Sequence, residues 1–547
     1  MKYPPNICNN RASAHHLFLN LIMKTVHVIQ ALCLLFIASP AGAASNYIGI
    51  NTNEAVHFDA SVPFADLFRT AEPFRENKEF TKGNISYDAN GWVRNLNGGQ
   101  AGTWIVRWLP AGTLPTGNYT VSYEGSGSLS YKESATLVSQ APGRDTITFK
   151  PDSNGEISAG LVIEKSDPAN PIRNIRVTLP GGICDNNPYQ RVNAAGQCGG
   201  GKYLPFAEAS AKVVFNPDYL NFMRQFRTVR FMNMSGITRN ELQSWDKRPH
   251  LEEATWGGKE GERGVPLEIM VQLANTLNAN PWFNLPHRAD DNFVRQYAEY
   301  VKANLRPNLR AYVEYTNEAW NSVFSQAQYV QQMGARERLD SVPLNAGLKY
   351  YAKRSKEIFQ IWEQVFGGKQ QLVRVLSGWA GNPATTPLIL KAFDVSKSTD
   401  VFALAPYFYA DQDALMQANS VDDIFGLLNG NQRYSISQTL RLLDQHALFL
   451  EPYGVGLVAY EGGQHLVHYG TKSKKEHPNP LLIEANRDPR MESAYIELLD
   501  GFRKAGGKLF MAFSSPRASA FYGSWGIKEH INQPPAEAPK YRALTRF

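Results

Sequence analysis

Short apolar runs and amphipathic segments alternate along the chain from Asn216 onward. Seven apolar runs predict strands: Thr228–Met232, Trp282–Leu285, Ala311–Tyr315, Leu372–Leu376, Val401–Ala405, Val455–Tyr460 and Leu509–Phe513. The helices predicted between them include Leu267–Leu277, Asn292–Leu305, Leu348–Phe366, Ile436–Leu448 and Met491–Ala505. Strands that alternate with helices are typical of parallel βαβ units.

An eighth strand is needed if these units close into a barrel, and Tyr47–Asn51 supplies it near the N-terminus. An open, doubly wound sheet is the alternative. We find no Gly-rich phosphate-binding loop after an early strand, a feature that such sheets often carry. The pattern therefore favours an α/β fold of the (β/α)8 TIM-barrel type.

Between Lys82 and Gly182 the pattern changes to short strands of β-branched and aromatic residues, broken by turn residues. These strands are Thr103–Trp108, Asn118–Tyr123, Thr146–Phe149, Gly160–Ile163 and Ile175–Leu179. Their spacing predicts a β-sandwich. We therefore expect the barrel to start in residues 44–81, to be interrupted by a sandwich over residues 82–182, and to continue over residues 183–547.

The N-terminus has the order of a secretory signal peptide. Lys24 precedes an apolar run from Val28 to Ala38, and small residues follow at 41–44. The run is too short for a permanent membrane-spanning helix, and a start at Met23 would give a more ordinary signal. We expect residues 1–43 to be a signal peptide with an N-terminal extension, and the mature chain to be secreted or periplasmic without membrane insertion.

Loss of residues 1–43 removes three cationic residues and no acidic one, so the formal net charge falls from +6 to +3. This small charge gives no support to a nucleic-acid partner. Cys184 and Cys198 are then the remaining cysteines, and in an exported chain we expect them to form a disulfide. Two unpaired thiols are the alternative. No CxxC or paired-His pattern indicates a metal site.

Side chains suited to sugar chemistry gather where the barrel strands are predicted to end, which is the active-site face of barrel enzymes. Glu318 follows the fourth strand and Glu461 the seventh. One such carboxyl can protonate the leaving oxygen while the other attacks the anomeric carbon, at a separation of roughly 5–5.5 Å in a retaining enzyme. Aromatic, amide, His and Arg side chains, which bind sugars, occur at the other strand ends. We expect neither a cofactor nor a metal.

These positions resemble glycoside hydrolase clan A, whose barrels hold the acid/base after strand four and the nucleophile after strand seven. The likeness is to enzymes such as families 5 and 39, covers about residues 45–80 and 183–547, and does not place the chain in one family. It implies that Glu318 is the acid/base, that Glu461 is the nucleophile and that Asn317 contacts the sugar 2-hydroxyl. The other candidates for substrate contact are Arg230, His287, Trp320, Trp379, Tyr407, Tyr409 and Trp525.

Some of these residues have simpler explanations. Glu314 lies on the same side of its strand as Glu318, so it could point into the barrel as a structural partner of Arg230. His287 could cap the helix that follows it, and the tryptophans could be ordinary packing residues. Strand six has two tyrosines where family 5 commonly has His-x-Tyr, which leaves the hydrogen-bond partner of the nucleophile open between them.

The sequence thus predicts a monomeric retaining hydrolase of β-linked poly- or oligosaccharides. A non-catalytic carbohydrate-binding protein on the same barrel is the main alternative, and the presence of both Glu318 and Glu461 argues for catalysis. An adhesive surface protein would repeat the sandwich, of which we find one copy. A serine esterase would carry Gly-x-Ser-x-Gly after a strand, and the barrel segment has no such motif. The identity of the glycan and the choice between endo and exo cleavage are left open.

Overall fold

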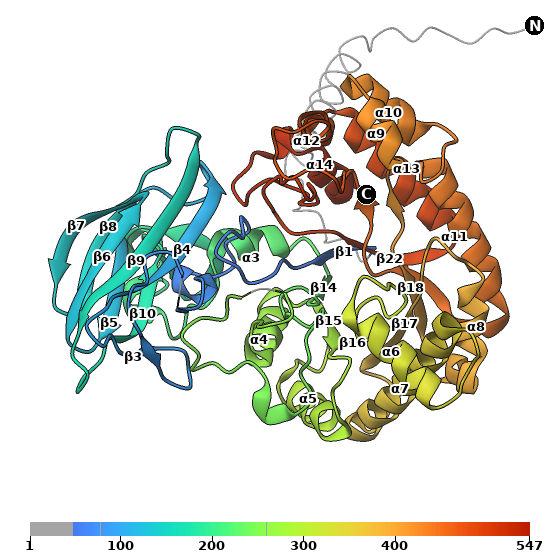
Figure 1. Ribbon diagram of the computed structural model, residues 1–547, viewed down its shortest axis with the longest axis horizontal. Coiled ribbons are helices and arrows are strands. Elements are labelled where there is room, and N and C mark those ends of the chain that lie inside the picture. The colour runs from blue at the N-terminus through green and yellow to red at the C-terminus, as the bar shows by residue number, and fades with distance from the viewer. Residues whose placement is uncertain (1–46, 77, 259) are drawn as a thin grey trace, which may run out of the picture. The chain divides into compact units, whose positions relative to one another are not determined.

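The computed structural model describes residues 47–547 apart from 77 and 259, so the predicted signal peptide lies outside the described residues. Eight parallel strands close into a barrel (Figure 1). In barrel order they are β1 (Ile48–Asn51), β14 (Thr228–Arg230), β15 (Asn280–Leu285), β16 (Ala311–Tyr315), β17 (Leu372–Ser377), β18 (Val401–Leu404), β20 (Gly456–Ala459) and β22 (Gly507–Ala512). The first strand pairs with both β14 and β22, which confirms the predicted barrel.

Helices surround the barrel (Figure 1). They include α4 (Leu267–Leu277), α5 (Asp291–Asn304), α7 (Pro343–Phe366), α8 (Thr385–Lys391), α11 (Ile436–Leu450) and α13 (Arg490–Lys504). In α7 the buried residues Leu348, Tyr351, Ala352, Ile358, Phe359 and Trp362 recur at the spacing of one helix face. Among the described residues, no helix is long and apolar enough to cross a membrane.

The two largest antiparallel sheets lie in the chain between β1 and β14. One has the order β4 (Ala101–Pro110), β9 (Glu156–Ser166) and β6 (Gly127–Glu133); the other has the order β10 (Arg173–Thr178), β5 (Tyr119–Glu124), β8 (Arg144–Phe149) and β7 (Ala135–Ala141). In β5, the buried residues Tyr119, Val121 and Tyr123 alternate with more exposed ones, as expected for strands with one buried face. The sheets fit the predicted additional domain, whose boundaries at residues 82 and 182 stay a prediction.

A small third sheet carries a disulfide. Its strands are β12 (Asn187–Val192), β11 (Gly182–Cys184) and β13 (Tyr203–Pro205). Cys184, at the end of β11, is bonded to Cys198, and their Cα atoms lie 5.4 Å apart. Both cysteines are buried. The pairing predicted from the sequence is therefore confirmed.

Replacing both cysteines with alanine should lower the free energy of unfolding by about 3 kcal/mol, because a disulfide that closes a loop of roughly 15 residues restricts the unfolded chain. Urea denaturation of the double variant and of the oxidised parent measures the difference. Mass analysis after alkylation of the unreduced protein is the control. Two alkylated thiols in the native protein would contradict the bridge.

Candidate active site

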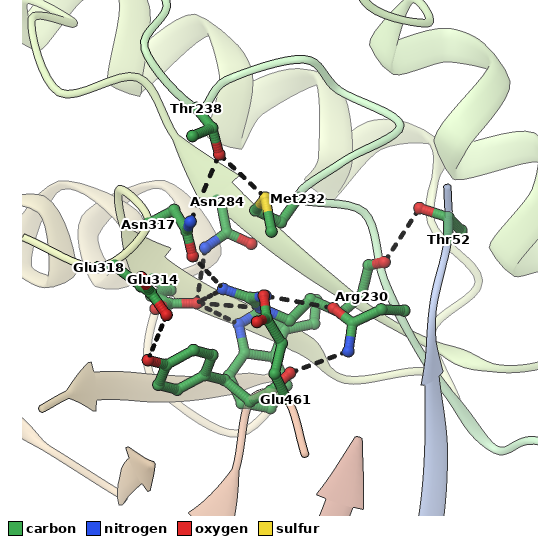
Figure 2. Close-up of polar contacts among 12 residues, drawn as sticks. Thr52, Arg230, Met232, Thr238, Asn284, Glu314, Asn317, Glu318 and Glu461 are labelled. Atoms are coloured by element: carbon green, nitrogen blue, oxygen red, sulfur yellow. Dashed lines mark hydrogen bonds and ion pairs between the residues drawn. The ribbon is translucent and has the colours of Figure 1, made fainter. Parts of the chain in front are cut away.

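The guanidinium of Arg230, at the end of β14, is the centre of a buried polar network (Figure 2). Its side chain is 0% exposed. It donates hydrogen bonds to the carboxylates of Glu314, over 3.1 Å, and Glu461, over 2.9 Å. It also donates to the amide oxygens of Asn51 and Asn317, over 3.2 and 3.1 Å. These contacts neutralise a cation that would be very costly to bury alone.

Glu461 follows β20 and is held by one cation and one hydroxyl. Arg230 donates to its Oε1, and Tyr407, in β19 (Tyr407–Phe408), donates to its Oε2 over 3.0 Å. The second tyrosine of this strand region, Tyr409, instead stacks on the ring of Tyr434 with centroids 4.2 Å apart. The hydrogen-bond partner that the sequence left open is therefore Tyr407.

Glu318 lies just beyond β16 and has different partners. Its Oε2 accepts a hydrogen bond from the Asn321 amide over 2.8 Å, and its Oε1 accepts one from the Tyr460 hydroxyl over 3.0 Å. Its backbone φ is 43°, a left-handed conformation that costs energy in a residue with a side chain. Tyr460 directly precedes Glu461 in the chain. The same residue therefore contacts Glu318 through its side chain and adjoins Glu461 through the backbone.

Burial raises the pKa of both carboxyls. It raises the pKa of Glu461 to about 7, although the Arg230 cation and the Tyr407 hydroxyl act in the opposite direction. Burial also raises the pKa of Glu318, against its two hydrogen bonds. The ion pair of Arg230 is with Glu461, and this contact favours the charged form of that carboxyl.

Glu314 lies within β16, deeper in the barrel, and is fully buried. Its Oε2 accepts hydrogen bonds from Arg230, from the Trp282 indole over 2.9 Å and from the Asn284 amide over 2.6 Å. A carboxylate enclosed in this way has no access to a ligand. Glu314 is therefore a structural counterion of Arg230, as its parity with Glu318 along the strand suggested.

Asn317 is oriented by the same guanidinium. Because Arg230 donates to its Oδ1, that atom is the acceptor and the amide nitrogen is left as a donor. The nitrogen lies 3.4 Å from the hydroxyl of Thr238 (Figure 2). The amide of Asn317 is thus held with a donor that a sugar hydroxyl can use.

Aromatic rings lie beside Glu461. The ring of His465 contacts those of Tyr407, Tyr409 and Trp525, at centroid distances of 5.4, 5.7 and 5.6 Å. Burial lowers the pKa of His465 to about 4, so this ring is neutral near pH 7. The cluster brings together three of the predicted substrate-binding residues and adds His465 to them.

A second aromatic pair lies beside Glu318. Trp320, two residues further along the chain, stacks on Trp379 with centroids 5.6 Å apart and planes inclined by 2°. Trp379 is 39% exposed. Flat apolar surface of this kind suits the faces of sugar rings.

The described contacts of His287 are with residues other than Glu318 and Glu461. Its Nε2 lies 3.6 Å from Glu241, its ring lies 5.2 Å from that of Tyr329, and burial lowers its pKa to about 4. The side chain that caps α5 is that of Asp290. No described contact joins His287 to the two catalytic candidates, so its role in sugar binding stays a prediction.

Sequence reasoning missed Tyr460, Asn321 and Asn51 as members of the site. In the sequence, Tyr460 is the last residue of an apolar strand, Asn321 is a loop residue and Asn51 ends the first strand. A search for polar side chains within three residues of each candidate carboxyl would have found the first two. Asn51 becomes visible only when the barrel closes and β1 is paired with β14.

No protein-family model and no curated protein matches the chain. Similar solved structures include a GH51 arabinofuranosidase from Xanthomonas axonopodis pv. citri, with 14% identity and a TM-score of 0.33 over 61% of this chain and 64% of that one. A GH10 protein from Paenibacillus barcinonensis matches with 12% identity and a TM-score of 0.35 over 60% of this chain and 89% of its own. A GH5-4 broad specificity endoglucanase from Clostridium longisporum matches with 10% identity and a TM-score of 0.37 over 67% and 94%.

Members of families GH51, GH10 and GH5 are thus among the solved structures that are similar to the chain. The chain spans less than two thirds of the Xanthomonas enzyme. At these identities and TM-scores, the matches assign neither a family nor an activity to the chain. Its function is argued from the geometry of the site.

Replacing Arg230 with methionine should lower the free energy of unfolding by about 3–5 kcal/mol, because two buried carboxylates lose their cation. Urea denaturation followed by circular dichroism measures the change. Arg490→Met is the matched control, since Arg490 also contacts two carboxylates but is 44% exposed. Ion pairs at an exposed site contribute little, so this change should leave the free energy of unfolding nearly unchanged. Equal costs in the two variants would contradict the central role of Arg230.

Proposed function

We propose that the chain is a secreted or periplasmic retaining glycoside hydrolase that cleaves β-linked poly- or oligosaccharides, with Glu318 as general acid/base and Glu461 as nucleophile. The observation that carries the proposal is the unequal pair of buried carboxyls at the barrel mouth, of which one faces a cation. A site that holds one carboxyl protonated and the other charged supplies the two groups that glycoside cleavage needs.

In the first step, Glu461 attacks the anomeric carbon while Glu318 protonates the glycosidic oxygen. The bond between carbon and oxygen breaks, its electron pair passes to the oxygen, and the leaving sugar departs with the proton. Arg230 and Tyr407 orient the attacking carboxylate. The amide nitrogen of Asn317 donates to the sugar 2-hydroxyl.

In the second step, water releases the sugar from Glu461. The glycosyl ester has no charge, so the pKa of Glu318 falls and this residue, now a carboxylate, can accept a proton from the water. The water oxygen attacks the anomeric carbon, the ester bond breaks, and its electron pair returns to Glu461. Two displacements at the same carbon restore the original configuration.

The aromatic residues divide between the two sides of the scissile bond. Trp525, with Tyr407 and Tyr409 around His465, lies on the side of the nucleophile and takes the sugar that becomes attached. Trp320 and Trp379 lie on the side of the acid and take the leaving sugar. We also propose that His287 contacts the substrate, and the support for this is its position after β15.

The same residues argue against a carbohydrate-binding protein without activity. Sugar binding requires flat rings and amide groups, both of which are present, but it gains nothing from two buried carboxyls with raised pKa values. A buried charge is costly, and sites that keep one are commonly reactive. Export is part of the proposal because residues 1–43 carry the order of a signal peptide.

Replacing Glu461 with glutamine should abolish hydrolysis of aryl β-glycosides and β-linked polysaccharides, because an amide is a poor nucleophile. Replacing Glu318 with alanine should slow substrates with poor leaving groups by roughly 100-fold or more, and added azide should restore turnover with a β-glycosyl azide as product. Proton NMR of the first product formed by the parent enzyme should show the β configuration.

Glu268→Gln is the matched control, because it breaks an ion pair with Arg248 on the outer helix α4 and should leave activity unchanged. Inversion at the anomeric carbon, or full activity of Glu461→Gln, would show that the assignment of roles is wrong.

Replacing Tyr407 with phenylalanine should move the acidic limb of the kcat/KM profile to higher pH by about 1–2 units. The hydroxyl stabilises the charged form of Glu461 and so lowers its pKa; a hydrogen bond to a charged group contributes about 1.5–3 kcal/mol. Without it, Glu461 becomes protonated at a higher pH and activity is lost sooner on acidification. An unchanged acidic limb would contradict the contact.

A further inference from the structure

Trp108, in the antiparallel strand β4, is an exposed indole in a strained backbone conformation. Its side chain is 49% exposed, and its φ is 55°. Left-handed backbone is rare in bulky residues and persists only where the surroundings enforce it. Isolated exposed apolar side chains are common on protein surfaces. An exposed indole on a strained backbone is less common and is a candidate for function.

The neighbours of Trp108 fix the orientation of its ring. Its backbone N–H donates to the hydroxyl of Ser158 over 3.0 Å. The guanidinium of Arg107 lies 4.1 Å from the indole centroid and 4.6 Å from that of Trp104. Arg107 is held in turn by Glu79, at 3.3 Å. A cation close to two indole rings is attracted to both, so these contacts hold the exposed ring in place as a platform.

This platform adjoins segments that follow the barrel strands. The backbone N–H of Arg107 donates to the carbonyl of His57 over 2.8 Å, and the ring of Phe58 lies 6.3 Å from that of Trp108. Both residues belong to the segment that follows β1. This segment leaves the barrel at Asn51, which contacts Arg230 in the site.

Two further contacts tie the edge of β4 to the mouth. Pro110 pairs with Glu156, whose carboxylate lies 3.0 Å from Lys474 in the loop beyond β21 (Gly463–Gln464). The turn after β4 accepts hydrogen bonds from Asn532, in the segment beyond β22. The carboxyl ends of β1, β20 and β22 all carry residues of the proposed site, and Figure 1 shows the antiparallel strands beside the barrel.

We infer that Trp108 is a remote sugar-binding subsite, on which a pyranose ring stacks when the rest of the same β-linked chain occupies the barrel mouth. The inference rests on the proposed function and deepens it: the substrate is a polysaccharide long enough to reach from the mouth to the antiparallel sheet. The apolar face of a pyranose ring fits the exposed indole surface, and the guanidinium of Arg107, which lies over the same indole, offers donors for sugar hydroxyls.

The test compares Trp108→Ala with Phe393→Ala. Phe393 is a matched control: it has a φ of 52° and is 43% exposed, but it lies in the segment that enters the amino end of β18, on the barrel face opposite to the mouth. Both changes are made in the Glu461→Gln background for binding and in the active enzyme for kinetics. Affinity electrophoresis uses gels that contain carboxymethylcellulose, galactomannan or arabinoxylan.

Trp108→Ala should weaken binding to the glycan in the gel, measured as retardation, roughly three- to tenfold. It should lower the kcat/KM for polysaccharide, relative to the kcat/KM for aryl glycoside, by a similar factor. Trp108→Phe should recover part of the loss, and Phe393→Ala should change neither quantity. Equal retardation and an equal kinetic ratio in Trp108→Ala and the parent overturn the subsite and leave the proposed function standing. Absence of retardation by all three glycans also overturns it, whereas absence of aryl-glycoside turnover overturns the proposed function itself.

Discussion

Much of this structure depends on the neutralisation of one buried guanidinium. Arg230 is fully enclosed, and a cation in that position is stable only if acceptors surround it. Three of its four acceptors are Asn51 at the end of β1, Glu314 within β16 and Glu461 beyond β20. Since strand register decides which side chains point inward, a shift of β14 by one residue would turn Arg230 away from all three. Barrel closure and the arrangement of the site therefore satisfy the same electrostatic requirement.

The two carboxylates that pair with Arg230 differ in whether their charge changes during the proposed reaction. Glu314 is enclosed by donors from the protein, so its ion pair with Arg230 persists whatever occupies the mouth. Glu461 is 6% exposed and in the proposed reaction becomes a neutral ester. At that point Arg230 still has Glu314 as counterion and is not left unpaired. A second carboxylate thus permits the first to change its charge at moderate cost.

The sequence patterns predicted the barrel well because its strands and outer helices have regular apolar spacing; α4 was predicted to the residue, and its C-cap Asn278 is left-handed. Elements without that spacing were missed. All residues of β7 after Ala135 are exposed, and α6 (Ser325–Arg336) is largely polar. Strand order located Glu318 and Glu461, but it could not show that Tyr460 reaches across to Glu318, because side-chain direction beyond a strand end depends on the tertiary structure.

The point of insertion is consistent with the sugar-binding subsite that we infer at Trp108 in the antiparallel domain. The chain leaves β1 at Asn51 and is anchored at once, since the amide of Asn53 donates to Asp59 and to the carbonyl of Pro516 beyond β22. Segments that follow parallel strands emerge on the face that carries the active site, so a domain inserted there adds surface beside the mouth without changing the register of any barrel strand. The same domain inserted before β1 would lie on the opposite face, where an exposed indole such as Trp108 could not meet a chain bound at Glu461.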